Sequence, residues 1–410
     1  MQTRPLACPS GPPWDDGVAV VRALRDAGHE SYLVGGCVRD LLLGRAVKDA
    51  DVATAAHPEQ VERCFARTIA VGRAFGVVVV VMPSGANIEV ATFRHDGAYV
   101  DGRRPTSVSY GTAADDVERR DFTINALLFD PLAGQVVDHV DGLADLAERR
   151  LRAVGDAAAR LREDRLRVLR ALRFAAQLGL AIEPATWDAI RATPLTGLSG
   201  ERIVQEWFKG LAGARRGDWL RLVVASGRMG EFSPPLGGLD ADGIDTTATR
   251  LDALADDDAD EVRAAIWLAA VAPAEALAWL EALPLPSALV DGVRWLLGPG
   301  RDGAALLALD EVARWRLLQR APTPSVARFQ RALGAGDALI GALERWSADP
   351  RARRDWTGRV RAADLIGLGV PRGPALGRML RAVEDEELAG RLRDRDQALA
   401  WAAARLGDSR

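Results

Sequence analysis

The sequence predicts an α+β fold in which a domain with a mixed sheet comes first and an all-helical remainder follows. Short apolar runs separated by turn residues recur before Gly142, as expected for strands and their connections. After Gly142 the strand signals largely vanish, and apolar residues recur at spacings of three and four, as from Leu161 to Ala176. At 410 residues the chain is too long for one ordinary core, so two to four domains are expected.

The first part of the chain is expected to alternate helices and strands. Apolar residues follow helical spacing over Val18–Ala27 and Pro58–Phe65. The run from Val77 to Met82 begins with five consecutive valines, which is typical of a strand buried at the centre of a sheet. The segments that we interpret as strands are Ser31–Val34, Asp49–Ala53, Gly76–Val81, Ile88–Phe93, Ile124–Phe129 and Val136–His139.

Four segments are expected along the chain. Residues 1–27 form an N-terminal extension and a helix, and residues 28–142 form the mixed-sheet domain. Residues 143–212 and 213–410 are two helical segments, which proline and glycine residues punctuate. The stretch from Ser233 to Asp258, rich in Pro, Gly and Asp, is the best internal boundary.

Composition narrows the class of protein. A net charge of −4 argues against a globally basic nucleic-acid binder, so any RNA-binding surface has to be a local patch. The three cysteines, Cys8, Cys37 and Cys64, are widely spaced, which favours neither a disulfide framework nor a zinc site. The sequence contains no apolar run of about 20 residues, and the first residues lack a signal-peptide core, so we expect a cytoplasmic protein without a membrane span.

The stretch from Leu33 to Thr54 carries the strongest chemical signal. Gly35 and Gly36 follow a strand-like run and precede a helical segment, where bare backbone N–H groups can receive a phosphate. Asp49 and Asp51 are two residues apart at the start of the next strand, so we expect both carboxylates on one face. Because like charges repel, such a pair is typical of a divalent-cation site.

Two neighbours strengthen this interpretation. Arg39 lies about one turn into the helix after the glycine pair, where a guanidinium can reach a phosphate. Glu89 stands between the apolar residues Ile88 and Val90 on an expected strand, so its side chain should face a site instead of the core. Three carboxylates around metal ions suit phosphoryl or nucleotidyl transfer.

A second cluster lies between Asp116 and Leu127. Arg119, Arg120 and Asp121 lead into an expected strand on which Asn125 and Thr123 alternate with apolar residues. Asparagine and threonine in mid-strand are suited to hydrogen-bond a sugar hydroxyl. A capped strand start with charged edges explains the same pattern, so this cluster leaves both interpretations open.

A third cluster runs from Glu163 to Phe174, where Asp164 and Arg167 are three residues apart on an expected helix and so share a face. An exposed ion pair is the ordinary explanation for such spacing. The alternative is base recognition, because cytosine and adenine both present an amine donor beside a ring-nitrogen acceptor, which a carboxylate and a guanidinium match. Arg170 and Arg173 make the helix locally basic, as contact with phosphate or RNA requires.

These stretches together resemble the class II tRNA nucleotidyltransferases (CCA-adding enzymes) and the related bacterial poly(A) polymerases. The carrying motifs are LVGGCVRDLLLG…DADVAT, IEVATFR, RRDFTINAL, EDRLRVLRALRFAAQLG and SGERIVQEWFKGL. They occupy roughly the first half of the chain. The resemblance implies a polymerase-beta-like nucleotidyltransferase head at 28–142 and a neck with a base-recognising helix at 143–212. It implies a helical body and tail at 213–410 that grip tRNA.

The resemblance also implies a role for each matching residue. Asp49 and Asp51 match the metal ligands, and Glu89 matches the third catalytic carboxylate. The triphosphate-binding positions are Gly35, Gly36 and Arg39, the ribose-binding positions are Arg120, Asp121 and Asn125, and the base-binding positions are Asp164 and Arg167. Glu201, Arg202 and Glu206 match a motif that braces the base-binding helix. The basic segment Asp96–Ser109 matches a loop that helps the site change from CTP to ATP, and an ordinary surface loop explains the same residues, so both interpretations stay open.

The implied activity is addition of CCA, or part of it, to tRNA 3′ ends from CTP and ATP, with Mg2+ and release of pyrophosphate. The alternatives are a poly(A) polymerase that uses ATP alone and, in another class, an inactive RNA-binding module. The stretch Val71–Val80 and the missing basic C-terminal tail favour CCA addition. The acidic cluster Asp240–Asp260 is expected to face away from RNA, because phosphates repel carboxylates. The sequence leaves the oligomeric state open.

Overall fold

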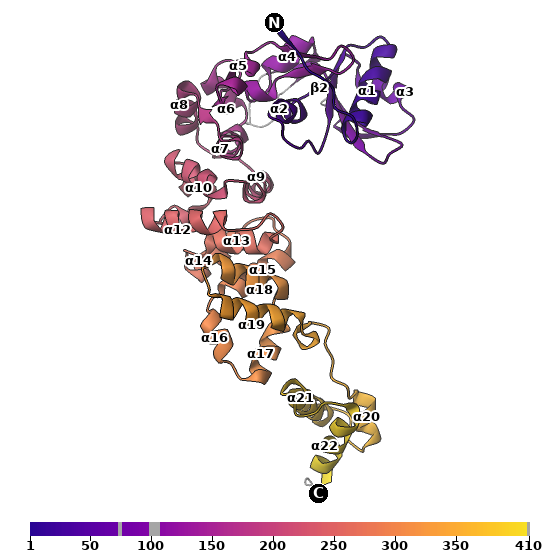
Figure 1. The fold of residues 1–410 in the computed structure, drawn as a ribbon, viewed down its shortest axis with the longest axis vertical. Coiled ribbons are helices and arrows are strands. Elements are labelled where there is room, and N and C mark those ends of the chain that lie inside the picture. The colour runs from indigo at the N-terminus through magenta and orange to yellow at the C-terminus, as the bar shows by residue number, and fades with distance from the viewer. Residues whose placement is uncertain (73–75, 98–106, 408–410) are drawn as a thin grey trace. The chain divides into compact units, whose positions relative to one another are not determined.

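The computed structural model describes residues 1–72, 76–97 and 107–407 (Figure 1). The chain forms two compact units, Met1–Gly237 and Gly238–Arg410. The division falls inside the stretch from Ser233 to Asp258 that the composition marks as a boundary. The finer boundaries at residues 27, 142 and 212 stay predictions.

An eight-stranded mixed sheet organises the first unit, with the strand order β1-β10-β9-β2-β3-β6-β5-β4. Strands β3 and β6 are parallel, with Val52 beside Val90, whereas the other pairs in this sheet are antiparallel. Residues along β5 alternate between half-buried and buried, and most of those along β6 alternate between exposed and buried, as in a sheet with one face on the core. The strands are β1 Gln2–Pro5, β2 Ser31–Val34, β3 Asp51–Thr54, β4 Thr68–Gly72, β5 Val77–Val81, β6 Asn87–Thr92, β9 Leu128–Asp130 and β10 Gln135–Asp138.

Short helices cover this sheet and connect its strands. Helix α1 (Trp14–Asp26) contacts β2 and β3 through buried residues such as Val20 and Leu24. The other helices of the sheet region are α2 Gly36–Leu42, α3 Pro58–Cys64, α4 Ala113–Glu118, the 3-10 turn η2 Thr123–Asn125 and α5 Gly142–Ala147. A small hairpin of β7 (Arg94–Asp96) and β8 (Val108–Tyr110) carries the segment that was expected to form the basic loop. Residues 98–106 of that segment, and residues 73–75 of Val71–Val80, lie outside the described residues.

The rest of the first unit is helical apart from one small parallel ladder. Strands β11 (Arg150–Leu151) and β12 (Ala181–Ile182) pair there, so the expected all-helical remainder contains two strands of two residues each. Both strands are too short to leave an alternation in the sequence. The helices are α6 Ala157–Glu163, α7 Leu166–Leu178, α8 Pro184–Ala192, α9 Gly200–Ala212, α10 Arg216–Ala225, α11 Met229–Phe232 and η3 Pro234–Leu236.

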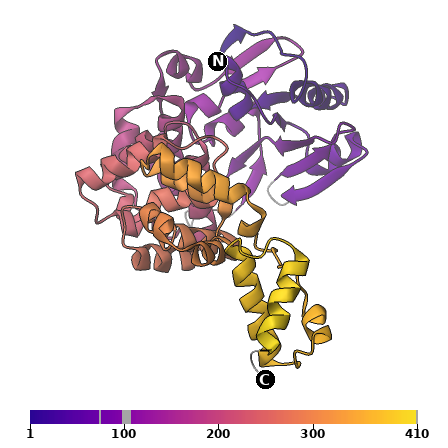
Figure 2. The same cartoon turned by 60° about the horizontal axis from the view of Figure 1, so that its bottom comes forward.

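The described residues of the second unit, up to residue 407, form helices and connecting turns. The bundle around Val262–Leu268 buries Trp267 completely, and α13 contacts α12, α15 and α18. Near the C-terminus α20, α21 and α22 contact one another around Leu365 and Val383 (Figure 2). The helices are α12 Ala241–Asp252, α13 Asp260–Leu268, α14 Pro273–Glu281, α15 Ser287–Leu297, α16 Gly303–Ala308, α17 Glu311–Leu318, α18 Thr323–Ala332, α19 Asp337–Ala348, η4 Pro350–Ala352, α20 Ala362–Gly367, α21 Pro374–Leu388 and α22 Arg395–Gly407.

One predicted strand is wrong in a way that matters for function. The segment expected as a strand from Ile124 to Phe129 begins with the 3-10 turn η2, and β9 starts only at Leu128. Thr123 and Asn125 therefore do not alternate along a strand. Asn125 accepts a hydrogen bond from Arg39 in this turn, so a specific polar contact overrides the β-branched composition.

A membrane-spanning segment is absent from the part of the chain that the structure describes: every helix there is too short or too polar to cross a bilayer.

Candidate active site

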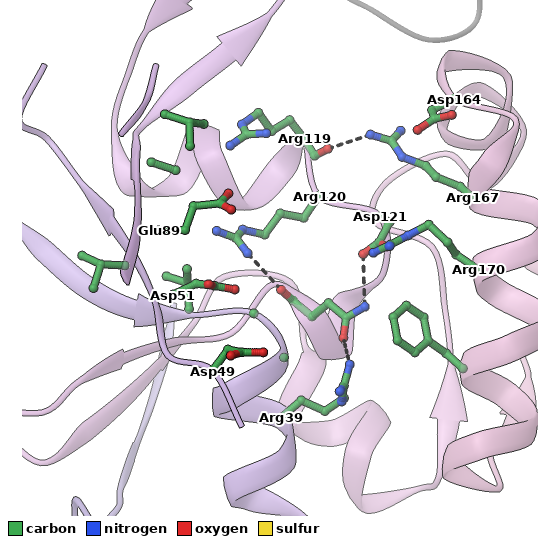
Figure 3. Close-up of a pocket in the computed structure, with 18 of the residues that line it drawn as sticks. Arg39, Asp49, Asp51, Glu89, Arg119, Arg120, Asp121, Asp164, Arg167 and Arg170 are labelled. Carbon is green, nitrogen blue, oxygen red and sulfur yellow. Dashed lines mark hydrogen bonds and ion pairs between the residues drawn. The ribbon is translucent and has the colours of Figure 1, made fainter. Parts of the chain in front are cut away.

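A cavity of about 750 Å3 in the first unit collects the side chains that the sequence singles out (Figure 3). Thirteen residues to which the sequence analysis gave a catalytic or binding role line it, from the sheet on one side and from helix α7 on the other. Its ionisable lining consists of eight cationic and five acidic side chains, so the cavity is suited to an anionic ligand. The predicted residues that line it are Gly35, Gly36, Arg39, Asp49, Asp51, Glu89, Arg120, Asp121, Asn125, Asp164, Arg167, Arg170 and Arg173.

Three carboxylates face this cavity, two from neighbouring parallel strands and one from the segment just before β3. Asp51 opens β3 and Glu89 lies on β6, and because Val52 stands beside Val90, the two acids are at matching positions. Asp49 precedes β3 instead of lying on it, but its side chain lines the same cavity. Burial, together with the nearby charges of Glu89 and Asp49, raises the pKa of Asp51 to about 6. The three acids repel one another.

This donor set fits a divalent cation, because carboxylate oxygens are the ligands that hard cations prefer. Within residues 1–72, 76–97 and 107–407, no three His, Cys, Asp or Glu side chains are gathered tightly enough to form a finished metal site. The residues that would hold a divalent cation are Asp49 and Asp51, with Glu89 beside them.

The glycine turn lies next to these acids. Gly35 has φ +77°, a conformation that L side chains rarely adopt, and Gly36 begins helix α2. A Cβ atom built on Gly35 would stand 3.4 Å from the guanidinium of Arg120. The turn is therefore open to the cavity and close to a cation, as a phosphate-binding turn requires.

A chain of hydrogen bonds crosses the floor of the cavity. Arg39 Nη1 donates to Asn125 Oδ1 at 2.6 Å, and Asn125 Nδ2 donates to Asp121 Oδ1 at 3.2 Å. Asp121 Oδ2 accepts from Arg170 Nε at 2.9 Å and Nη2 at 2.6 Å. Burial alone would raise the pKa of Asp121, but the Arg170 guanidinium and the Asn125 amide hold it below its usual range. The chain joins the sheet domain to helix α7.

One aromatic ring supports three of the arginines. The guanidinium carbons of Arg39, Arg170 and Arg173 lie 5.1, 5.2 and 4.3 Å from the ring centroid of Phe174. Stacking against a ring fixes the plane of a guanidinium. Arg173 also donates from Nε to Glu206 Oε2 at 2.7 Å, and both residues are buried.

The base-recognition pair does not lie on one helix, which corrects the expectation from spacing. Helix α6 ends at Glu163, Asp164 is its C-cap with φ −143°, and α7 starts at Leu166. The break between the two helices still leaves Asp164 and Arg167 on the same cavity wall. Spacing of three residues suggests a continuous helix, and the sequence EDRLRVLR contains no glycine or proline that would mark the break.

Both members of this pair are held by other residues. Arg167 donates from Nη1 to Glu163 Oε2 at 2.6 Å and from Nη2 to the Arg119 carbonyl at 3.1 Å. The carboxylate of Asp164 accepts from Arg202 Nη1 and Nη2 at 2.9 and 2.8 Å. Arg202 on helix α9 thus braces the segment that carries Asp164, as the matching motif implied.

Sequence reasoning missed four polar or aromatic residues of the cavity as site residues. Arg119, Phe174 and Lys209 all stand inside motifs quoted above, and Arg119 belongs to the second cluster described there, although no site role was given to any of the three. Arg94 closes the quoted motif IEVATFR and opens β7, but the pattern around it does not by itself distinguish it from a surface arginine. The missed residues are Arg94, Arg119, Phe174 and Lys209.

Comparison with known proteins identifies this arrangement. The model of the Poly A polymerase head domain matches residues 31–152. The chain is 39% identical to the CCA-adding enzyme of Geobacillus stearothermophilus over 306 residues, which cover 74% of this chain and 72% of that protein. It is 32% identical to the CCA-adding enzyme of Lacticaseibacillus paracasei, over 97% of this chain and 98% of that one.

The chain belongs to the CCA-adding enzyme family. The crystal structure of the Bacillus stearothermophilus CCA-adding enzyme in complex with CTP superposes with a TM-score of 0.81 at 31% identity, covering 98% of this chain and 99% of that one. The Thermotoga maritima CCA-adding enzyme complexed with tRNA has the same fold, with a TM-score of 0.69 at 19% identity. The expected α+β fold, with a mixed-sheet head and a mostly helical remainder, is confirmed.

Proposed function

We propose that this chain adds C, C and A to the 3′ ends of tRNA from CTP and ATP, without a nucleic-acid template and with release of pyrophosphate. The observation that carries the proposal is the meeting of Asp49, Asp51 and Glu89 with the glycine turn in one arginine-lined cavity. The relatives that cover nearly the whole chain are CCA-adding enzymes, which favours this activity over a poly(A) polymerase or an inactive RNA-binding module.

We propose Mg2+ as the cation of the carboxylate site, held by Asp49 and Asp51 with Glu89 as the third acid. When bound, such an ion lowers the pKa of an attacking hydroxyl and neutralises phosphate charge. We assign the tRNA 3′ hydroxyl to this group of carboxylates, oriented towards the α-phosphate, with Glu89 as the group that receives the proton leaving this hydroxyl. The new bond joins the 3′ oxygen to the α-phosphorus, and pyrophosphate leaves.

The triphosphate is assigned to the glycine turn. Gly35 and Gly36 offer backbone N–H groups, and Arg39 stands behind them with its plane fixed by Phe174 and Asn125. Because Arg39 is already hydrogen-bonded in this position, binding a phosphate costs little further side-chain ordering. Arg170 and Arg173, on the opposite wall, are assigned to phosphate or RNA backbone.

The ribose and the base are assigned to the adjoining part of the cavity. Asn125 and Asp121 present an amide and a carboxylate to the sugar hydroxyls, with Arg120 beside them. Asp164 accepts from the exocyclic amine of cytosine or adenine, and Arg167 donates to the ring nitrogen. Since Arg202 occupies both oxygens of Asp164 from behind, the base has to use the remaining lone pairs of that carboxylate.

The test uses tRNA transcripts that end before CCA, after C and after CC. Each is incubated with Mg2+ and CTP, ATP or both, and the products are separated at single-nucleotide length. Growth that stops at CCA supports the proposal, whereas arrest at CC or addition of A alone indicates a partial activity. Long A tails on any RNA indicate a poly(A) polymerase, and no incorporation contradicts an enzymatic role. A cytoplasmic location stays a prediction.

A further inference from the structure

We propose that Asp116 is the positioning residue for Arg119 and Arg120, and that it sets the affinity of the site for both nucleoside triphosphates. The inference rests on the proposed function, because it concerns the same cavity. Asp116 itself is placed behind the cavity, on helix α4, whereas the two arginines line it.

The carboxylate of Asp116 is fully buried and binds both arginines. Its Oδ1 accepts from Arg119 Nε at 2.9 Å, and its Oδ2 accepts from Arg120 Nη2 at 3.0 Å and Nε at 3.2 Å. Each oxygen therefore serves a different guanidinium. Burial raises the pKa of Asp116, but the charges of Arg120 and Arg119 outweigh burial and hold the pKa below its usual range, so the group is ionised.

The arginine held in this way reaches the chemical centre of the cavity. Arg120 Nη1 donates to the Asn125 carbonyl at 3.3 Å and lies against Gly35 of the glycine turn. Figure 3 shows its guanidinium beside the carboxylates of Asp51 and Glu89. A guanidinium between the glycine turn and the carboxylates is better placed to contact the phosphates of a bound nucleotide than to contact the sugar of that nucleotide.

This placement changes the role that the motif match gave to Arg120. The ribose is assigned to Asn125 and Asp121, whose side chains are hydrogen-bonded to each other. Arg120 instead spans from Asp116 to the glycine turn. We therefore infer that Asp116 holds Arg120 ready for the triphosphate, with Arg119 held alongside by the same carboxylate.

The alternative is that Asp116 only stabilises the fold, and the chain contains a matched control for it. Asp145 is also buried, accepts from Thr123 Oγ1 at 2.6 Å and Arg152 Nε at 2.8 Å, and pairs with Arg150. Arg150 and Arg152 are not among the described side chains that line the cavity. Loss of charge at Asp145 should therefore affect stability without affecting nucleotide affinity.

The experiment compares the full-length wild type with Asp116→Asn and Asp145→Asn. Equilibrium dialysis measures CTP and ATP binding without tRNA, and steady-state kinetics measures KM for each nucleotide and for tRNA. Asparagine keeps the shape of Asp116 but directs an amide towards one guanidinium, so we expect dissociation constants and KM values for CTP and ATP about tenfold higher. KM for tRNA and the preference for CTP over UTP should not change, nor should any of these values in Asp145→Asn.

A second variant keeps the test decisive if Asp116→Asn folds poorly. Arg120→Lys retains the charge but loses the fork that Asp116 grips, and it should raise the same two nucleotide constants. Adding Asp116→Asn to it should raise these constants by less than it does in the wild type, because the contact with Arg120 is already broken and only the contact with Arg119 is left to lose. Unchanged nucleotide binding in either variant, or an equal loss in Asp145→Asn, overturns the inference. A wild type that binds CTP but extends no tRNA contradicts the proposed function instead.

Discussion

Replacing Asp51 by Asn should stabilise the metal-free protein at neutral pH while it abolishes nucleotide incorporation. The reason is that burial and the nearby Glu89 and Asp49 raise the pKa of Asp51 to about 6. A carboxyl whose pKa is higher in the fold than in the unfolded chain favours folding when it is protonated. That stability is lost as the pH rises through about 6, because Asp51 then ionises in the folded protein. An Asn side chain stays neutral, so the variant does not lose this stability.

The size of the effect follows from linkage. A shift of about two pKa units corresponds to about 3 kcal/mol at pH 7.5 as an upper limit. Asp51 is exposed to water in the cavity, and screening reduces this value to about 1–1.5 kcal/mol. For a folded unit of this size, such a gain corresponds to a melting temperature higher by about 2–6 °C.

The assay is thermal unfolding in EDTA from pH 4 to pH 8, for the wild type, Asp51→Asn and Asp121→Asn. The difference between Asp51→Asn and the wild type should be near zero at pH 4, grow between about pH 4 and pH 6, and level off above pH 6. Asp121→Asn should show the opposite sign, because Arg170 holds the pKa of Asp121 below its usual range despite burial. A less stable Asp51→Asn protein at pH 8, or a difference independent of pH, would refute the repulsion argument.

Three further predictions concern other parts of the chain. Glu206→Ala should lower the free energy of unfolding by about 3–5 kcal/mol, measured by urea denaturation, because it leaves buried Arg173 without its partner; Glu206→Gln should cost less. Arg167→Ala should reduce discrimination against UTP before it abolishes incorporation, and unchanged base choice would contradict the base-recognition role. Crosslinks from tRNA should avoid the acidic stretch Asp240–Asp260, and crosslinks concentrated there would contradict its expected orientation.

The sequence predicted the cavity residues better than the elements that carry them. Glycine turns and acidic pairs have short signatures, because each needs only local geometry and a few residue types. The register that sets Asp51 beside Glu89 depends on pairing between β3 and β6, which are far apart in the chain. The sequence could place each acid on a strand, but only the pairing of the two strands in the fold brings the acids close together.

The misses have physical causes as well. Thr123–Asn125 has the composition of a strand, yet tertiary hydrogen bonds to Asn125 select a 3-10 turn. The sequence also carries no local signal for the break between α6 and α7. Asp164 lies outside both helices there, and its carboxylate pairs with Arg202 on α9. In both places the contacts of a side chain that lines the cavity set the backbone conformation. Secondary structure predicted from local propensity is therefore wrong at the site itself.

The pairing of arginines in the cavity also explains why a chain of net charge −4 can bind a triphosphate. Asp116 holds Arg119 and Arg120, Asp121 holds Arg170, and Glu206 holds Arg173. Each acid fixes the guanidinium of its arginine before a nucleotide arrives. Such acids lower the overall charge without removing the positive wall that the ligand meets. Net charge therefore says little about this site, because what matters is which atoms of each ion pair face the cavity.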